Sequence, residues 1–280
     1  MSNVFLFLFI NMYYIFLFFL PVFFITDIDV SGIGDEIKSR NILSNCLQNS
    51  VQSTFNRISV DTDTSTSDTI TIMSSNQKKL NSKDLKIFQK KLTKMCYDLS
   101  DDVVRNGEGV SHVMKCTVTN ASSELVAVGV GKSVVNSPLL KCAVNGNDPN
   151  VGRLISSVGK YFSQPGIDDV VVDSFDPLKC VVSIGGITIF KKGTFCLNEK
   201  SERKVMEHMK EAELYTSCGK VNENGTVSYV KEENENFPKH KRCVEIVIDL
   251  GMDDGGGYEA SVLGSSLSHE YVAENADYRS

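Results

Sequence analysis

Three aspartates lie close together in the stretch "FNRISVDTDTSTSDTITIMSS", residues 55–75: Asp61, Asp63 and Asp68. Carboxylates two residues apart in a loop can converge on a hard metal cation. No glycine follows them, and no glutamate closes the loop at the distance that a calcium loop uses. We therefore favour the alternative, in which Asp, Ser and Thr side chains hydrogen-bond the amides of a turn between two strands and bind no metal.

The cysteines and histidines do not form a further recognisable site. The eight cysteines include no C-x-x-C pair, so neither a zinc site nor a redox motif is indicated. Several cysteines lie in strand-like runs such as "KCVVSI", where a buried thiol acts as a small hydrophobic side chain, and this usage indicates a reducing compartment. His112 is more typical of a strand edge than of a catalyst, because the four histidines are scattered and no serine elbow accompanies them.

Length and charge narrow the class of protein. The chain has 280 residues, 41% of them hydrophobic, which is enough to bury a full core in one large domain or two closely packed ones. The formal net charge is −6, and no basic stripe is present to neutralise phosphates. The sequence therefore argues against nucleic acid as a partner.

Strand-like and helix-like segments alternate along the chain. Expected strands cover residues 57–60, 69–74, 113–120, 139–145, 169–175, 180–193 and 242–251, and expected helices cover residues 35–55, 81–104, 122–136, 150–162 and 201–215. Ser82 is the expected N-cap of the second helix. The polar, charged residues 221–242 predict an exposed loop or insertion. This order predicts an α+β fold with layered sheets covered by helices.

The beginning of the chain is apolar and allows more than one interpretation. Residues 4–25 carry no charge and are long enough to span a bilayer, which would anchor the chain in a membrane. No basic residue precedes them and no small-residue cleavage site follows, so the flanks of a signal or anchor are missing. We expect a helix over residues 4–20, and we separate residues 1–21 from a single domain over residues 22–280.

Four blocks of the sequence carry a resemblance to a known family: "NRISVDTDTSTSDT", "NGEGVSHVMKCTVTNA", "VVNSPLLKCAVNGNDPNVGRLISSVG" and "YVAENADYRS". They are similar, in the same order, to blocks of the ornithine acetyltransferases, also called glutamate N-acetyltransferases of the cyclised arginine pathway. The resemblance covers residues 22–280, the part that the family uses as its C-terminal, or β, subunit. It implies a mixed fold with β-sheets stacked between helical layers, in which residues 23–26 form a buried strand.

The resemblance also implies a reaction. The family is known for a precursor that cuts itself before a threonine, whose hydroxyl takes an acetyl group from N-acetylornithine and passes it to glutamate. No cofactor is implied, although some members use acetyl-CoA as a co-substrate. The threonine should precede a strand similar to "VFFITD", but Phe19 stands near that place and no threonine occurs before Thr26. We therefore expect no catalytic nucleophile in this chain, and a heterotetramer-like assembly with an α-chain of the family for activity.

Three residues match substrate-contacting positions of the family. Glu108 in "GEG" corresponds to a glutamate that contacts the substrate's amino group, with an exposed turn as the alternative interpretation. Asn275 and Ser280 correspond to residues that contact the substrate's polar end, provided that the last helix docks. The resemblance implies that the turn with Asp61 and Asp63 is structural and lies close to the active-site layer. Direct contact of Asp61 or Asp63 with the ligand is the alternative.

Several positions depart from the family's blocks, among them Thr62 and His112. Thr62 replaces a glycine, which is costly if the turn there needs a positive φ, and His112 replaces a lysine. Such departures are consistent with relaxed selection or with a divergent lineage, and two classes of function remain. The first is a glutamate N-acetyltransferase present as a truncated chain that is inactive alone, in the mitochondrial matrix of a eukaryote or in the cytoplasm otherwise. The second is a non-catalytic remnant or a membrane-anchored binding protein.

Overall fold

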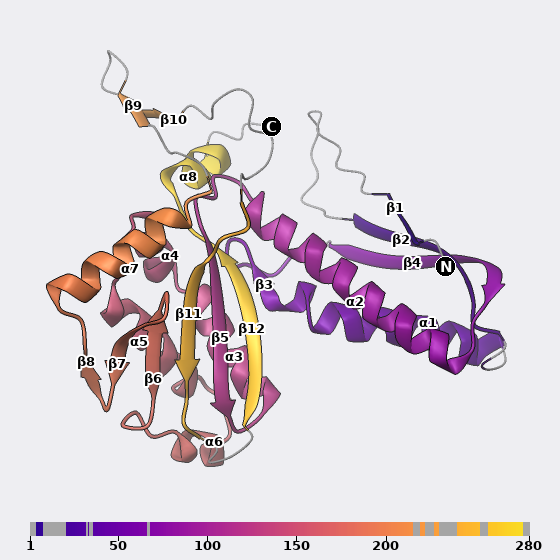
Figure 1. Cartoon of the computed structure of the whole chain (residues 1–280), viewed down its shortest axis with the longest axis horizontal. Helices are drawn as coiled ribbons and strands as arrows, with labels where there is room; N and C mark the ends of the chain where they lie inside the picture. Colours follow the sequence, from indigo (N-terminus) through magenta and orange to yellow (C-terminus); the bar gives the residue numbers. More distant parts are fainter. Residues whose placement is uncertain are drawn as a thin grey trace. The chain divides into compact units, whose positions relative to one another are not determined.

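The computed structural model describes residues 4–7, 21–31, 33, 36–65, 68–214, 219–221, 227–229, 240–252 and 257–276. These residues belong to two compact units of the chain. Unit 1 comprises Met1–Asn56 and Asp63–Ser100, and unit 2 comprises Arg57–Thr62 and Asp101–Ser280. Figure 1 gives the labels of the helices and strands in each unit.

Unit 1 is a small sheet packed against helices. Its three strands are β1 (Val4–Phe7), β2 (Pro21–Asp29) and β4 (Thr69–Lys79), in the order β1-β2-β4, with β2 antiparallel to β1 and parallel to β4. Helix α1 (Glu36–Gln52) and most of α2 (Ser82–Arg105) complete the unit. Phe24, Leu92 and Cys96 lie in its buried core. Apolar side chains alternate along β2 and recur at helical spacing along α2, so both elements turn their apolar faces toward this core.

Two predictions concern the start of this unit. The predicted strand over residues 23–26 is confirmed as part of β2, with Phe24 and Thr26 buried. The predicted helix over residues 4–20 is wrong for Val4–Phe7, which pair with β2 as a strand, and its remainder lies outside the described residues. A short aromatic and aliphatic run suits either structure, and pairing with a neighbouring strand decides between them. Of the helices in the described part of the chain, none is both long and apolar enough to cross a membrane.

Unit 2 is built on a mixed seven-stranded sheet in the order β3-β12-β5-β11-β6-β7-β8. Its strands are β3 (Ile58–Ser59), β5 (Val113–Ala121), β6 (Val181–Ile184), β7 (Ile187–Lys191), β8 (Thr194–Phe195), β11 (Val244–Asp249) and β12 (Tyr258–Ser265). The pairs β3–β12 and β5–β11 are parallel, and the other neighbours are antiparallel. The predicted mixed α/β class is confirmed.

The helices of unit 2 are α3 (Glu124–Val135), α4 (Pro138–Asn145), α5 (Val151–Phe162), α6 (Asp169–Ser174), α7 (Glu199–Glu211) and α8 (His269–Ala276). The valine-rich α3 packs directly on the sheet. The approach is so close that a Cβ added at Gly131 would stand only 2.8 Å from the side chain of Val262 on β12. Helix α8 lies at the end of the sheet where β5 and β11 begin and β12 ends (Figure 1). Two short strands outside this sheet, β9 (Gly219–Val221) and β10 (Val227–Tyr229), pair with each other. Strand β10 lies within the predicted insertion of residues 221–242, and β9 ends at its first residue.

Several local predictions are wrong because helix caps outweigh apolar content. The predicted strands over residues 139–145 and 169–175 belong largely to the helices α4 and α6. Ser137 accepts a hydrogen bond from the amide of Leu140 and precedes a proline, which favours the start of α4. Asp168 caps α6, because its Oδ1 accepts a hydrogen bond from the amide of Val170 at 2.8 Å. The N-cap of α2 is Asn81 rather than Ser82, since Asn81 Oδ1 accepts from the amides of the second and third helical residues.

Candidate functional site

Two of the predicted substrate-binding residues meet in unit 2, although 167 positions separate them in the chain. Asn275 Nδ2 donates to Glu108 Oε2 at 2.7 Å, and both side chains are exposed to solvent. Ser280, the third predicted residue, and Phe19, which stands near the expected place of the nucleophile, lie outside the described residues. The structure thus brings together the two predicted residues that it describes.

The turn that carries Glu108 is shaped by the glycine that follows. Gly109 has a φ of +59°, a conformation that costs other residues free energy. A Cβ at Gly109 would stand 2.8 Å from the carbonyl carbon of Glu270, and closer still to the amide nitrogen of Tyr271. Both atoms belong to the backbone of α8, so a side chain here would collide with the helix itself.

A single hydroxyl docks α8 on this turn. Ser268 Oγ donates to the carbonyl oxygen of Gly109 at 2.6 Å and accepts from the amide of Tyr271 at 3.1 Å. The second bond is that of a helix N-cap. The last helix therefore docks, which is the condition on which the predicted role of Asn275 depends. Ser268 is not among the predicted site residues, although a serine just before a helix is an available signal.

The turn after β3 adds a second carboxylate to the same helix. Tyr271 Oη donates to Asp61 Oδ2 at 3.3 Å, so Asp61 and Glu108 contact residues one turn apart on α8. Thr62 has a φ of +82°, which confirms that this turn needs the backbone conformation of a glycine. Threonine therefore holds a strained conformation directly beside Asp61.

The other aspartates of the predicted turn, Asp63 and Asp68, belong to unit 1. Ser65 Oγ accepts a hydrogen bond from the amide of Asp68 at 3.3 Å, which is the kind of turn contact that the sequence predicts. Among the described residues, no three His, Cys, Asp or Glu side chains come close enough together to hold a metal ion.

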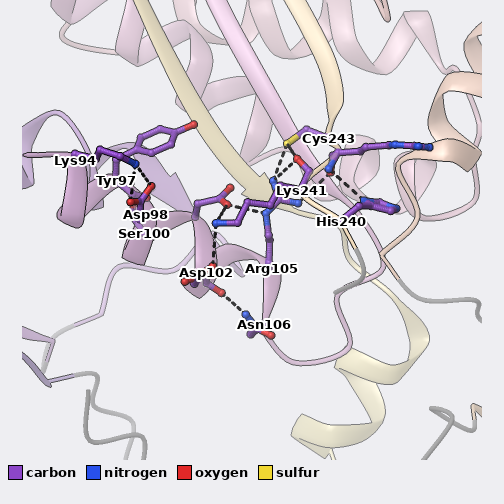
Figure 2. A network of polar contacts seen from close by, with 12 residues as sticks. Lys94, Tyr97, Asp98, Ser100, Asp102, Arg105, Asn106, His240, Lys241 and Cys243 are labelled. Atoms are coloured by element: carbon purple, nitrogen blue, oxygen red, sulfur yellow. Dashed lines mark hydrogen bonds and ion pairs between the residues drawn. The ribbon is translucent and has the colours of Figure 1, made fainter. Parts of the chain in front are cut away.

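A buried arginine fixes the end of α2 just before the turn with Glu108 (Figure 2). Arg105 is 3% exposed, and its Nε donates to Asp101 Oδ2 at 2.8 Å. Its Nη2 donates to the carbonyl oxygen of Lys241 at 2.9 Å, and its Nη1 donates to that of Arg242 at 3.0 Å. Lys241 also pairs with Asp101 at 3.5 Å. This network ties the helix end to the segment that leads into β11, and so anchors one side of the Glu108 turn.

His112 lies directly before β5, as expected for the end of a strand, but it is buried rather than at an edge of the sheet. Its Nδ1 lies 2.8 Å from Ser111 Oγ, and its Nε2 lies 3.2 Å from Asn147 Oδ1. Burial lowers the pKa of His112, while the nearby Glu213 carboxylate partly opposes that effect. Ser266 Oγ accepts from the amide of His112 at 3.0 Å, so this network joins the start of β5 to the connection between β12 and α8.

The described side chains suit an amino acid as ligand. Glu108 and Asp61 offer carboxylate oxygens, which form strong charge-assisted hydrogen bonds with an ammonium group. The amide of Asn275 can donate to a carboxylate, as it donates to Glu108 in this structure. The arrangement therefore presents carboxylate acceptors and an amide donor, which are complementary to the two charged ends of a zwitterion.

Comparison with known proteins finds a matching family and similar sequences. The sequence profile described as the ArgJ family matches residues 22–280. The chain is 32% identical over 256 residues to "Arginine biosynthesis bifunctional protein ArgJ 2" of Clostridium acetobutylicum, covering 91% of this chain and 52% of that protein. It is 32% identical over 259 residues to the "Glutamate N-acetyltransferase" of Methanocaldococcus jannaschii, covering 91% of this chain and 53% of that protein.

A solved structure agrees with these matches. The crystal structure of the arginine biosynthesis bifunctional protein argJ from Bacillus halodurans superposes with a TM-score of 0.67 at 26% identity, over 93% of this chain and 98% of the solved chain. The chain spans about half the length of the curated relatives that it matches.

Proposed function

The chain belongs to the ArgJ family, and on that premise we propose that it binds the amino-acid substrate in a glutamate N-acetyltransferase of arginine biosynthesis. The reaction is acetyl transfer from N-acetylornithine to glutamate. The observation that carries the proposal is the hydrogen bond of 2.7 Å between Asn275 and Glu108. It brings two family-matched residues from distant parts of the chain to one place on the surface of unit 2.

In this function, Glu108 accepts hydrogen bonds from the substrate's ammonium group, and Asn275 donates to its carboxylate. Before the substrate arrives, the two side chains satisfy each other. A bound amino acid would separate them and give each a partner of opposite polarity, which is favourable because both new contacts involve an ion. Glutamate and N-acetylornithine both present a carboxylate, and each also presents an ammonium group, at its α or its δ position.

Acetyl transfer needs two further groups, a nucleophile and donors for the oxyanion, which we assign to a threonine that this sequence lacks before Thr26 and to the α-chain, respectively. An acyl-enzyme route requires a nucleophile, and the tetrahedral intermediate requires donors for its oxyanion. The segment 1–25 contains no threonine. We therefore expect the 280-residue chain to bind its substrate without transferring the acetyl group, and a family α-chain to be needed for turnover.

Isothermal calorimetry with glutamate and with N-acetylornithine tests the binding role. Glu108→Gln and Asn275→Ala should each weaken binding by at least tenfold, because each leaves one charged end of the substrate unpaired. Glu207→Gln is the matched control, since Glu207 is an exposed glutamate of α7 away from these contacts and its loss should leave binding unchanged. Equal affinities for all variants would remove the basis of the proposal.

A reconstitution experiment tests the catalytic assignment. The 280-residue chain is mixed with both substrates, and any acetylated protein is located by mass spectrometry. We expect none. A second chain, in which a threonine-led start replaces residues 1–21 and which is coexpressed with the α-portion of a relative, should become acetylated on that threonine. Turnover by the unmodified chain alone would contradict the assignment.

A further inference from the structure

A lysine lies completely buried beneath the Glu108 and Asp61 turns. Lys141 of α4 has no exposed surface, although it carries an ammonium group. Its Nζ donates to the carbonyl oxygen of Val60 at 2.9 Å and to the carbonyl oxygen of Ser265. Burial lowers its pKa to about 8, and the negative charge of Asp61 partly opposes that shift. A buried cation is costly unless its donors are satisfied, so these two carbonyl groups largely decide where the side chain can lie.

The two acceptors belong to two different segments of the site. Val60 directly precedes Asp61, and Ser265 is the last residue of β12, from which the chain runs to Ser268 and α8. The backbone of Lys141 adds a third contact, since its carbonyl oxygen accepts from the amide of Leu267 at 3.4 Å. One residue thus holds both the turn of Asp61 and the connection that leads to Asn275.

The turn of Glu108 rests on the same frame. A Cβ at Gly107 would stand 3.0 Å from Val60 Cγ1, which shows how closely this turn packs against the residue that Lys141 holds. Ser265 Oγ donates to the carbonyl oxygen of Val104 at 2.8 Å, near the end of α2. All three segments that carry Asp61, Glu108 and Asn275 therefore meet at the two residues that accept from Lys141.

We propose that Lys141 is a positioning residue for the substrate site, whose ammonium group fixes the spacing of Asp61, Glu108 and Asn275 by holding Val60 and Ser265 together. The expected effect of Lys141 on substrate binding and turnover rests on the proposed function. Its structural part, the ordering of α8 by Lys141, can be tested without any substrate.

Lys141→Met removes the donors and keeps a side chain of similar length. Lys132→Met is the matched control, because Lys132 of α3 is partly buried and donates to the carbonyl oxygen of Ile58, on the strand that leads into the same turn, whereas this hydrogen bond does not involve Ser265. Both variants lose an ammonium group and its hydrogen bond to a backbone carbonyl oxygen. Only the first loses the link between the two site segments.

Hydrogen exchange followed by mass spectrometry gives the first readout. In Lys141→Met, peptides covering residues 265–276 should exchange at least tenfold faster than in the wild type, while β5 and β11 keep their protection. In Lys132→Met, residues 265–276 should exchange at the wild-type rate. Unchanged protection of α8 in Lys141→Met would overturn the proposal, whether or not the chain binds a substrate.

Substrate affinity gives the second readout. If the wild type binds glutamate, Lys141→Met should weaken binding at least tenfold, and Lys132→Met by less than twofold. In the reconstituted enzyme, the same change should raise KM more than it lowers kcat. Equal losses in the two variants would assign Lys141 a structural role only. If Lys141→Met does not fold, Lys141→Gln, which keeps an N–H donor, should fold and show an intermediate exchange rate in α8, and a wild-type rate would count against the proposal.

Discussion

Gly109→Ala is expected to undock α8 from the turn that carries Glu108. At a φ of +59° an alanine costs about 1–2 kcal/mol relative to glycine. The new Cβ would stand 2.8 Å from the carbonyl carbon of Glu270 and closer still to the amide of Tyr271. Because these atoms are backbone, rotation of a side chain cannot relieve the collision, and the helix must move. The hydrogen bond from Ser268 Oγ to the Gly109 carbonyl is then lost, at a cost of about 1 kcal/mol.

The two contributions give a loss of about 2–3 kcal/mol in the free energy of unfolding. Denaturation in guanidinium chloride measures this loss, and calorimetry with glutamate measures the accompanying loss of affinity. Gly159→Ala in α5 is the control. Apart from its chain neighbours and the backbone of its own helix, no described atom lies within 4 Å of the place that its new Cβ would take, and an alanine in a helix should stabilise the protein by about 0.5–1 kcal/mol. If Gly109→Ala unfolded at the wild-type midpoint and kept its affinity, the assignment of α8 docking to this glycine would be wrong.

Three further outcomes are expected. Thr62→Gly should raise the free energy of unfolding by about 1 kcal/mol, because it removes the strain at a φ of +82°, and a lower denaturation midpoint would show that the threonine side chain contributes more than the strain costs. The pKa of Lys141 is about 8 in the folded state, against an ordinary value of 10.5, so between these values the unfolded state binds more protons and the stability of the wild type rises with pH. The stability that Lys141→Met loses relative to the wild type should therefore grow by about 2 kcal/mol from pH 7.5 to pH 9.5. A difference that stayed constant over this range would contradict the lowered pKa. Arg105→Met should cost about 3–5 kcal/mol in urea denaturation, because the buried Asp101 loses its closest partner, and the additional change Asp101→Leu should recover part of that loss.

The sequence predicted long elements better than short ones. The helical spacing of α2 and the valine-rich run of α3 identified both helices, and the apolar runs of β5 and β11 identified two strands, whose parallel pairing only the structure shows. The short apolar runs of α4 and α6 were misassigned, because periodicity over six to eight residues does not separate a strand from a capped helix. In such runs, the capping residue is the stronger signal.

The site was only partly predictable for a different reason. Glu108 and Asn275 were identified by matching motifs, and the structure brings them together. The contact of Asp61 with Tyr271 and the burial of Lys141 depend on segments far apart in the chain. The acceptors of Lys141 are backbone carbonyl groups, which every residue has, so no pattern of side chains could indicate them. Tertiary packing alone decides these positions.

The place of β12 in the sheet has a consequence for how the protein is made. Among the described strands of unit 2 this one comes last in sequence, yet it lies between β3 and β5. During synthesis on the ribosome, β5 can pair on one side only until Tyr258–Ser265 has emerged, and β3 lacks its neighbour in the sheet. Chains interrupted before β12 would expose the edge of β5, which is a template for aggregation. Incomplete translation products of this protein should therefore require chaperone protection more than the finished chain does.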